Sequence, residues 1–224
     1  MSFQPHWEAI PDQTRVTLEA LISLPELGEF YLAGGTALAL QIGHRLSYDL
    51  DFFSSTNRLG APERTLLADR LAELPSAVIL SQSDTMLYIA IMDVEASFIY
   101  QHHSLLRPLE KLGSLSVAGP VDIGLTKLAA IKDRGRRRDF VDLYCLRHLA
   151  PLEMLLDLLP ENYHDRPDFA LHLAYALRYF EDAENDPREL ITLRPVSWAD
   201  AKKYCESGAR LLTRRLTGLD PKGT

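Results

Sequence analysis

A pair of aspartates and a pair of glycines are the residues of this sequence that could do chemistry together. Asp49 and Asp51 lie in an apolar run and are separated by the strand period of two, so both carboxylates would project from one face. Upstream, Gly34-Gly35-Thr36 follows a short apolar run, where glycines would bring backbone N–H groups close to an anion at a helix N-terminus. Paired carboxylates facing a phosphate-binding turn describe a site for a metal-bound nucleotide.

Each half of this pattern also has an ordinary structural explanation. Gly-Gly-Thr is typical of a tight turn, Thr36 could cap a helix, and an Asp-x-Asp pair often lies on a solvated edge. The order of the segments predicts strand, glycine turn, helix and strand over residues 30–53. Two known phosphate-binding motifs are excluded, because the segment has neither the lysine of a P-loop nor a G-x-G-x-x-G pattern.

Three segments carry a resemblance to a known family: GGTAL, GHRLSYDLDFF and KLAAIKDRGRRRDFVDLYCL, all between residues 34 and 146. They resemble the AbiEii/AbiGii-type nucleotidyltransferases of the DNA-polymerase-beta-like superfamily, which typically serve as toxins of toxin–antitoxin pairs. The resemblance implies a Mg²⁺-dependent enzyme with a two-metal site that transfers a nucleotide from an NTP to RNA, with the tRNA 3′ end as the favoured acceptor, or to another acceptor such as a protein. It also implies an antitoxin encoded nearby as a partner.

The first group of predicted site residues lies around the glycine turn. Asp49 and Asp51 would bind the metal, since Mg²⁺ prefers a few carboxylates plus phosphate oxygens. Gly34, Gly35 and Thr36 would hold the β- and γ-phosphates through backbone N–H groups and the Thr36 hydroxyl. Ser47 would help to position phosphate or cap a turn. His44 and Arg45 lie at the end of the predicted helix, where cations suit the helix dipole, and structural roles are expected for both.

A second group lies downstream, at Lys127 and Asp139. The resemblance places Lys127 in the nucleotide site, where it would supply positive charge against the triphosphate, and Asp139 would complete the pocket. A solvated face is the alternative for Lys127, and an N-cap of the next helix is the alternative for Asp139. Asp142 is expected to be structural.

Four arginines next to this group form a basic run. Arginine forks suit RNA phosphates, so the run would contact an RNA substrate, although a solvated loop between helices would look the same. The four residues are Arg134, Arg136, Arg137 and Arg138.

A third metal carboxylate is the point at which the sequence departs from the wider superfamily. Such enzymes often add one from a later strand, but Ser97 occupies the corresponding position of the predicted strand 95–100. Glu95 lies two residues away on the same predicted face. Either Glu95 completes the metal site or only two carboxylates do.

The fold class expected from these patterns is α+β, with a nucleotidyltransferase-type mixed β-sheet and flanking helices followed by a helical C-terminal half. Residues 1–118 would form the catalytic core, and residues 119–224 would complete the nucleotide and substrate site. The apolar runs 78–80 and 87–92 predict strands covered on both faces, joined to the next strand by a turn at Asp93-Val94. The predicted helices cover residues 14–24, 62–74, 120–134, 139–149, 152–159, 168–181 and 197–216.

Composition sets the remaining limits. A chain of 224 residues with 46% hydrophobic and 25% charged residues can bury a full core. A formal net charge of −7 argues against a protein that coats nucleic acid nonspecifically. No signal peptide or membrane-spanning run is evident, which predicts a cytoplasmic protein with reduced cysteines.

Two alternative functions stay open at this stage. A phosphotransferase could use the same metal site to move the γ-phosphate of an NTP. A non-catalytic binding protein could have kept the fold, and the missing third carboxylate gives that alternative some weight.

Overall fold

The computed structural model describes residues 3–219, and the chain falls into two units, Met1–Gly119 and Pro120–Thr224. This division lies next to the expected boundary near residue 118, whereas the functional roles of the two halves stay predictions. No helix in the described residues is long and apolar enough to cross a membrane.

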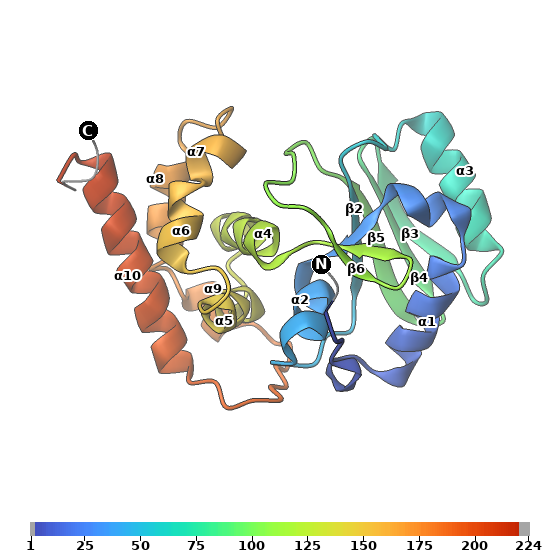
Figure 1. The fold of residues 1–224 in the computed structure, drawn as a ribbon, viewed down its shortest axis with the longest axis horizontal. Helices are drawn as coiled ribbons and strands as arrows, with labels where there is room; N and C mark the ends of the chain where they lie inside the picture. The colour runs from blue at the N-terminus through green and yellow to red at the C-terminus, as the bar shows by residue number, and fades with distance from the viewer. Residues whose placement is uncertain (1–2, 220–224) are drawn as a thin grey trace. The chain divides into compact units, whose positions relative to one another are not determined.

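The N-terminal unit is built on a seven-stranded sheet with helices. The strands are β1 (Tyr31–Ala33), β2 (Leu50–Ser54), β3 (Val78–Ser83), β4 (Met86–Ile91), β5 (Val94–Tyr100), β6 (Glu110–Leu112) and β7 (Leu115–Val117). The helices are α1 (Asp12–Ile22), α2 (Gly34–Ile42) and α3 (Ala61–Ala72), with short 3₁₀ helices at Trp7–Ala9 and Pro25–Glu29. The predicted order of strand, glycine turn, helix and strand is therefore confirmed (Figure 1).

The sheet is mixed, with the strand order β3-β4-β5-β2-β1-β7-β6. β2 runs antiparallel to β1 and parallel to β5, and β1 runs parallel to β7. This arrangement confirms the expected α+β class. The register sets Asp51 opposite Ala33 on one side and opposite Ser97 on the other, so the central strands carry the predicted metal residue.

The core around β2 explains why that register is fixed. Leu50 and Phe52 are fully buried, whereas Asp51 and Phe53 on the other face are half-buried. Phe52 stacks on Phe98 of β5 with ring centroids 5.2 Å apart. A slip of one residue would turn Asp51 into this apolar face, and the burial of a carboxylate there would oppose the slip.

The prediction that residues 78–80 form a strand covered on both faces is wrong. β3 is an edge strand, and Val78, Ile79 and Leu80 are 57%, 43% and 46% exposed. β4 is covered chiefly on one face, since Leu87, Ile89 and Ile91 are buried and the alternate residues are half-buried. A short apolar run has the same appearance in a central strand and at an edge, so the sequence pattern did not distinguish them.

The hairpin between β4 and β5 turns one residue earlier than predicted. The turn consists of Met92 and Asp93, with φ angles of 49° and 63°, and β5 already begins at Val94. Two central residues with positive φ are the geometry that matches the twist of paired strands in a tight hairpin. The short β6–β7 hairpin was not predicted, because its strands have three residues each and no clear apolar alternation.

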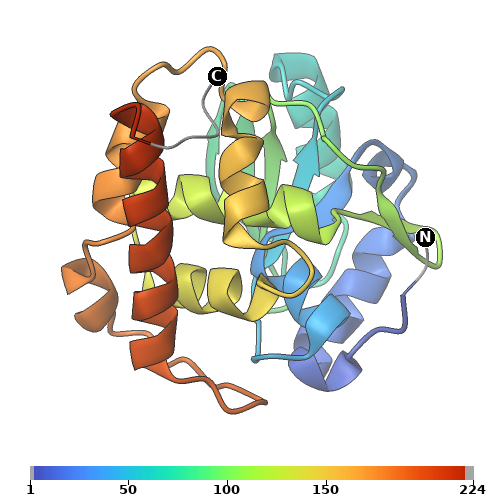
Figure 2. The same ribbon diagram turned by 60° about the vertical axis from the view of Figure 1, so that its left-hand side comes forward.

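The C-terminal unit is helical, as expected. Its helices are α4 (Pro120–Asp133), α5 (Arg137–Leu146), α6 (Leu152–Asp157), α7 (Leu159–Asn162), α8 (Phe169–Ala176), α9 (Glu181–Glu184) and α10 (Trp198–Leu216). α10 lies beside α8 (Figure 2). The Ser197 hydroxyl accepts a hydrogen bond from the Asp200 N–H at 3.2 Å, which confirms the predicted cap of α10.

Two predicted helices of this unit are each broken into two. The helix expected over 152–159 ends at Asp157, and Pro160 then occupies the first turn of α7, where its missing N–H is tolerated. The helix expected over 168–181 ends at Ala176. Phe180 lies in the gap and packs against Phe140 and Trp198 at centroid distances of 5.2 and 5.9 Å, so tertiary packing prevails over local helix preference there.

Both cysteines are free thiols, as predicted. Burial within α10 raises the pKa of Cys205 to about 12, which keeps it an unreactive thiol.

Candidate active site

The glycine turn lies where β1 passes directly into α2. Gly34 is the first residue of the helix and has a φ of 65°, a left-handed conformation that favours glycine. A methyl group on Gly34 would also collide with the Asp51 carboxylate. The backbone of this turn is therefore in close contact with the predicted metal residue, and the first N–H groups of α2 lie next to it.

Asp51 is held by a hydrogen bond from the neighbouring strand. The Ser97 hydroxyl donates to Asp51 Oδ1 over 2.7 Å, and Ser97 itself is buried. Asp49 lies one residue before β2 begins, and Asp49 and Asp51 are both half-buried with the fully buried Leu50 between them. This alternation is what a shared orientation of the two carboxylates requires.

The register of β5 shows which residue lies where a third carboxylate was considered. Ser97, not an acidic residue, lies opposite Asp51. Glu95 is exposed and accepts a hydrogen bond from the Tyr88 hydroxyl. Within residues 3–219 no group of three or more histidine, cysteine, aspartate or glutamate side chains is arranged to hold a metal ion. A metal at this site would therefore depend on two carboxylates and on oxygens of the substrate.

Thr36 and Ser47 are used inside the protein, in a way that the sequence did not reveal. Thr36 is buried, its hydroxyl donates to the Asp49 carbonyl, and it lies 2.9 Å from the Ser47 hydroxyl. The Ser47 N–H donates to the carbonyl of Ala9. These contacts attach the segment before β2 to the first turn of α2, so they position Asp49 through its backbone.

Arg45 is placed differently from the expectation. It was expected at the C-terminal end of the helix, but its guanidinium lies against Gly35, in the first turn of α2, where a methyl group would collide with Nη2. Arg45 is only 4% exposed, and His44 beside it is also buried. The expectation failed because the chain reverses after Gly43, a left-handed C-cap, and runs back along α2.

In the C-terminal unit, Lys127 is at the centre of a buried ion network. Lys127 is 5% exposed, and its ammonium lies 3.0 Å from Asp139 Oδ1 and 2.6 Å from Asp142 Oδ2. The alternative of a solvated face is therefore wrong for Lys127. Asp142 is structural as expected, in the sense that it joins α5 to α4 through this lysine.

Asp139 belongs to the same network and is not an N-cap. The cap residue of α5 is Arg136, and Asp139 lies within the first turn of the helix with no exposed surface. Burial favours a raised pKa for Asp139, but Lys127, together with Arg134 at 3.4 Å, holds the pKa of this carboxyl below its usual range. Asp139 is therefore ionised in the folded protein at neutral pH.

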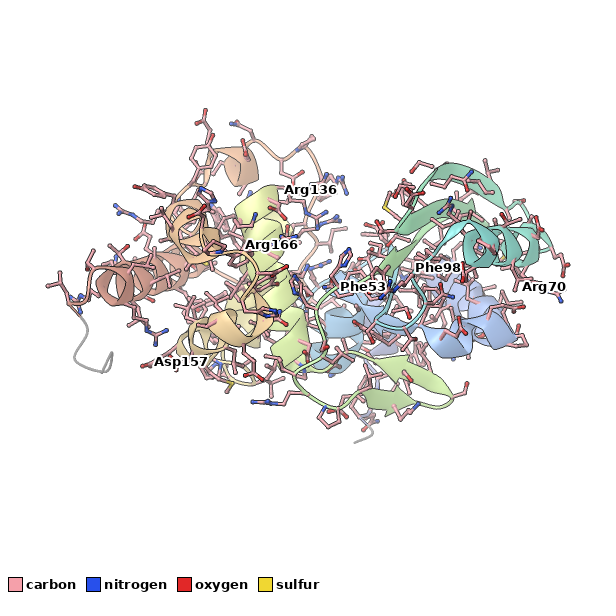
Figure 3. All side chains as sticks on the ribbon, turned by 90° about the horizontal axis from the view of Figure 1, so that it is seen from above. Phe53, Arg70, Phe98, Arg136, Asp157 and Arg166 are labelled. Atoms are coloured by element: carbon pink, nitrogen blue, oxygen red, sulfur yellow. The ribbon has the colours of Figure 1, made fainter. Side chains whose placement is uncertain are left out.

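The arginine run is only partly directed to solvent. Arg134 contacts Asp139, and the Arg137 guanidinium lies 5.0 Å from the Trp198 ring centroid. Arg136 lies near the C-terminal end of α4 (Figure 3). Burial, and then the positive charges of Arg188, Arg134 and Arg138, lower the pKa of Arg136. The sequence did not indicate Arg188, which comes from a loop some fifty residues downstream.

The structure thus brings the predicted residues together in two groups, one in each unit. The first group contains Gly34, Gly35, Thr36, Ser47, Asp49 and Asp51, with Ser97 and Arg45 in addition. The second contains Lys127, Asp139 and Arg134, with Asp142 in addition. The first group places a carboxylate beside a glycine turn at a helix N-terminus, on the central strands of a mixed sheet. This is the arrangement of a nucleotidyltransferase fold.

Comparison with known proteins agrees with this assignment of the fold. The chain resembles MenT4, a nucleotidyltransferase toxin from Mycobacterium tuberculosis, with a TM-score of 0.52 and 18% sequence identity over 91% of this chain and 86% of that one. At this identity the likeness concerns the fold alone.

The family follows from the sequence comparisons. Residues 17–91 match the family described as "Nucleotidyl transferase AbiEii toxin, Type IV TA system". An uncharacterized protein of Aquifex aeolicus is 35% identical over 200 residues, which cover 86% of this chain and 92% of that protein. The chain belongs to the AbiEii nucleotidyltransferase toxin family, and it is a nucleotidyltransferase.

Proposed function

We propose that this nucleotidyltransferase is Mg²⁺-dependent and transfers a nucleoside monophosphate from an NTP to RNA, with the tRNA 3′ end as the favoured acceptor. The observation that carries the proposal is the contact between Asp51 and the turn at Gly34. It supports the proposal because the Asp51 carboxylate, which would bind the metal, lies beside the N–H groups that would receive the phosphates.

The residues present fit a magnesium site. Asp51 retains Oδ2 for a ligand while Ser97 occupies Oδ1, and Asp49 is fixed through its carbonyl. Mg²⁺ is commonly bound by one or two carboxylates together with substrate phosphates and waters, which matches a site with two acidic residues. Two such ions would stabilise the attacking and leaving oxygens of the transfer.

The protein's own groups would bind and orient the substrate. Backbone N–H groups at Gly35 and Thr36 would hold the β- and γ-phosphates, while the Thr36 and Ser47 hydroxyls keep the segment before Asp49 in register. Lys127 and Asp139 are proposed to complete the nucleotide site, as the family resemblance implies. Lys127 forms ion pairs with two carboxylates, so the main effect of its charge would be to hold Asp139 in position.

The RNA acceptor is supported by the arginines at the start of α5. The positive charges of Arg188, Arg134 and Arg138 act on Arg136 and lower its pKa, while Asp186 acts in the opposite direction. An RNA phosphate would offset this repulsion. A cognate antitoxin is the further partner that membership of a toxin–antitoxin family suggests.

The test is to incubate the purified chain with each α-labelled NTP and total RNA, with Mg²⁺ or with a chelator. We expect label on RNA of tRNA size only with Mg²⁺, and none with Asp51→Asn. Label on a protein would refute the RNA acceptor. Transfer of γ-label without α-label would show a phosphotransferase. Failure to bind Mg²⁺-NTP in calorimetry would favour a protein that kept the fold without the activity.

A further inference from the structure

The position of Arg45 is the feature of the first group that its proposed chemistry has not yet explained. The guanidinium is buried against Gly35, and Nη1 donates to the Leu46 carbonyl over 2.8 Å. The Ser47 hydroxyl lies on the same side of Gly35, 3.2 Å from where its Cβ would be. Arg45 also takes part in further interactions within the protein.

The charge of Arg45 is at an unfavourable end of the helix. The N-terminus of a helix carries partial positive charge, so anions are stabilised there and cations are not. A buried guanidinium also loses hydration. Arg45 nevertheless places a positively charged group against the first turn of α2.

The two glycines are therefore required for different reasons. On one side, Gly34 leaves room for the Asp51 carboxylate, and on the other side Gly35 leaves room for the Arg45 guanidinium. The turn has a metal-binding group against its first residue and a fixed cation against its second. This separation matches a metal–triphosphate, in which the metal and the phosphate oxygens need opposite charges from the protein.

We propose that Arg45 is a positioning residue of the triphosphate site, which holds the Gly34–Gly35 turn in place and adds a fixed positive charge behind the N–H groups that bind phosphate. This inference rests on the proposed NTP site but not on the identity of the acceptor. It differs from a purely structural role, because a structural arginine would change stability without changing the affinity of the folded protein for a polyphosphate.

The test uses the full chain, with inorganic tripolyphosphate and Mg²⁺ as the probe in calorimetry, and with NTP kinetics in parallel. Arg45→Gln removes the charge, and Arg45→Lys keeps the charge but not the two-pronged guanidinium. Arg70→Gln is the matched control, because Arg70 lies on α3 and is about half exposed (Figure 3). Thermal unfolding of each variant separates loss of fold from loss of binding.

We expect Arg45→Gln to weaken tripolyphosphate binding and to raise KM for the NTP roughly ten-fold or more, as for the loss of one charged interaction. Arg45→Lys should recover part of the affinity, and Arg70→Gln should match the wild type. Gly35→Ala, whose methyl group would displace Nη2, should weaken binding as well. The double variant Gly35→Ala/Arg45→Gln should then lose little more than either single variant, because both remove the same interaction.

Equal affinity of wild type and folded Arg45→Gln would overturn the inference, as would a wild-type chain that does not bind tripolyphosphate. If Arg45→Gln does not fold, unchanged affinity in both Arg45→Lys and Gly35→Ala has the same consequence. A wild-type chain that binds tripolyphosphate through Arg45 but transfers no nucleotide would leave the inference standing and refute the proposed transfer.

Discussion

Asp51 and Asp139 are both carboxylates of the predicted site, yet they have opposite surroundings. Asp51 is half-buried on a central strand, with the Ser97 hydroxyl on one oxygen and the glycine turn beside the other. Asp139 has no exposed surface and is next to Lys127 and Arg134. A partly exposed carboxylate can exchange solvent for a ligand, whereas a buried one in an ion network also holds helices together.

The comparison has a practical consequence for mutagenesis. Substitutions around Asp51 should remove activity and leave the fold, because little of the core depends on that side chain. Substitutions around Asp139 should damage the fold of the C-terminal unit, so a loss of activity there would not by itself identify a catalytic group.

The largest expected effect is on activity, at Asp51. Asp51→Asn should lower nucleotide transfer by about 10³-fold or more, because it would remove a ligand of the proposed metal, and Asp49→Asn should do the same. The unfolding midpoint should change little. The control is Asp69→Asn, an exposed aspartate of α3 in the same unit. Wild-type turnover by purified Asp51→Asn would refute the assignment of the metal site.

The next effect is on stability, at Lys127. Lys127→Met should lower the free energy of unfolding by about 3–5 kcal/mol, since it leaves Asp139 and Asp142 buried without their shared cation. Urea unfolding measures this change. Lys203→Met, at an exposed position of α10, should change stability by less than about 0.5 kcal/mol. A change at Lys127 as small as the control would show that the network does not hold the unit together.

The third prediction concerns stability at acid pH, which should depend on Asp139. Because the folded-state pKa of Asp139 is lowered, its contribution to stability is fully present above about pH 4, the usual aspartate value, and is lost as pH falls through the lowered pKa. Urea unfolding midpoints between about pH 2 and 6 should fall less steeply for Asp139→Asn than for the wild type. Asp165→Asn, exposed in the same unit, should keep the wild-type slope. Identical slopes for all three would contradict the lowered pKa.

The smallest effect is expected at Ser97. Ser97→Ala removes the hydrogen bond to Asp51 Oδ1. The Mg²⁺ concentration needed for half-maximal transfer should rise several-fold, which corresponds to roughly 1 kcal/mol. Ser81→Ala, exposed on β3, is the control. A loss as large as that of Asp51→Asn would mean that Ser97 itself contacts the metal or the substrate.

Local patterns were sufficient to predict much of this molecule. The strand period of two predicted the burial of Leu50 between the half-buried Asp49 and Asp51, and the Ser197 cap and the α4 helix followed from short-range signals. The same patterns could not predict contacts made after a chain reversal. Arg45 was assigned to the nearer helix end because sequence distance suggested it, while the turn at Gly43 carries its guanidinium to the opposite end.

The buried state of Lys127 was hidden for a related reason. Its apolar neighbours on the helix indicated a protected face, but the cost of burying a lysine argued for solvent. Asp139 and Asp142 on the next helix make that burial acceptable, and a pairing between two helices cannot be read from either one alone. The exposure of β3 was not predicted for the same reason. A strand's exposure depends on its position in the sheet, and β3 lies at the edge.

The hairpin turn at Met92 and Asp93 offers a way to reinforce the scaffold of the N-terminal unit. Both residues have positive φ, which residues other than glycine, asparagine and aspartate adopt at a cost of roughly 1–2 kcal/mol, so Met92 is the strained residue of the pair. Met92→Asn with Asp93→Gly would supply the pair that this hairpin geometry prefers. A chain strengthened in this way would tolerate damaging substitutions in its own unit, and Arg45→Gln could then be examined in a protein that is still folded.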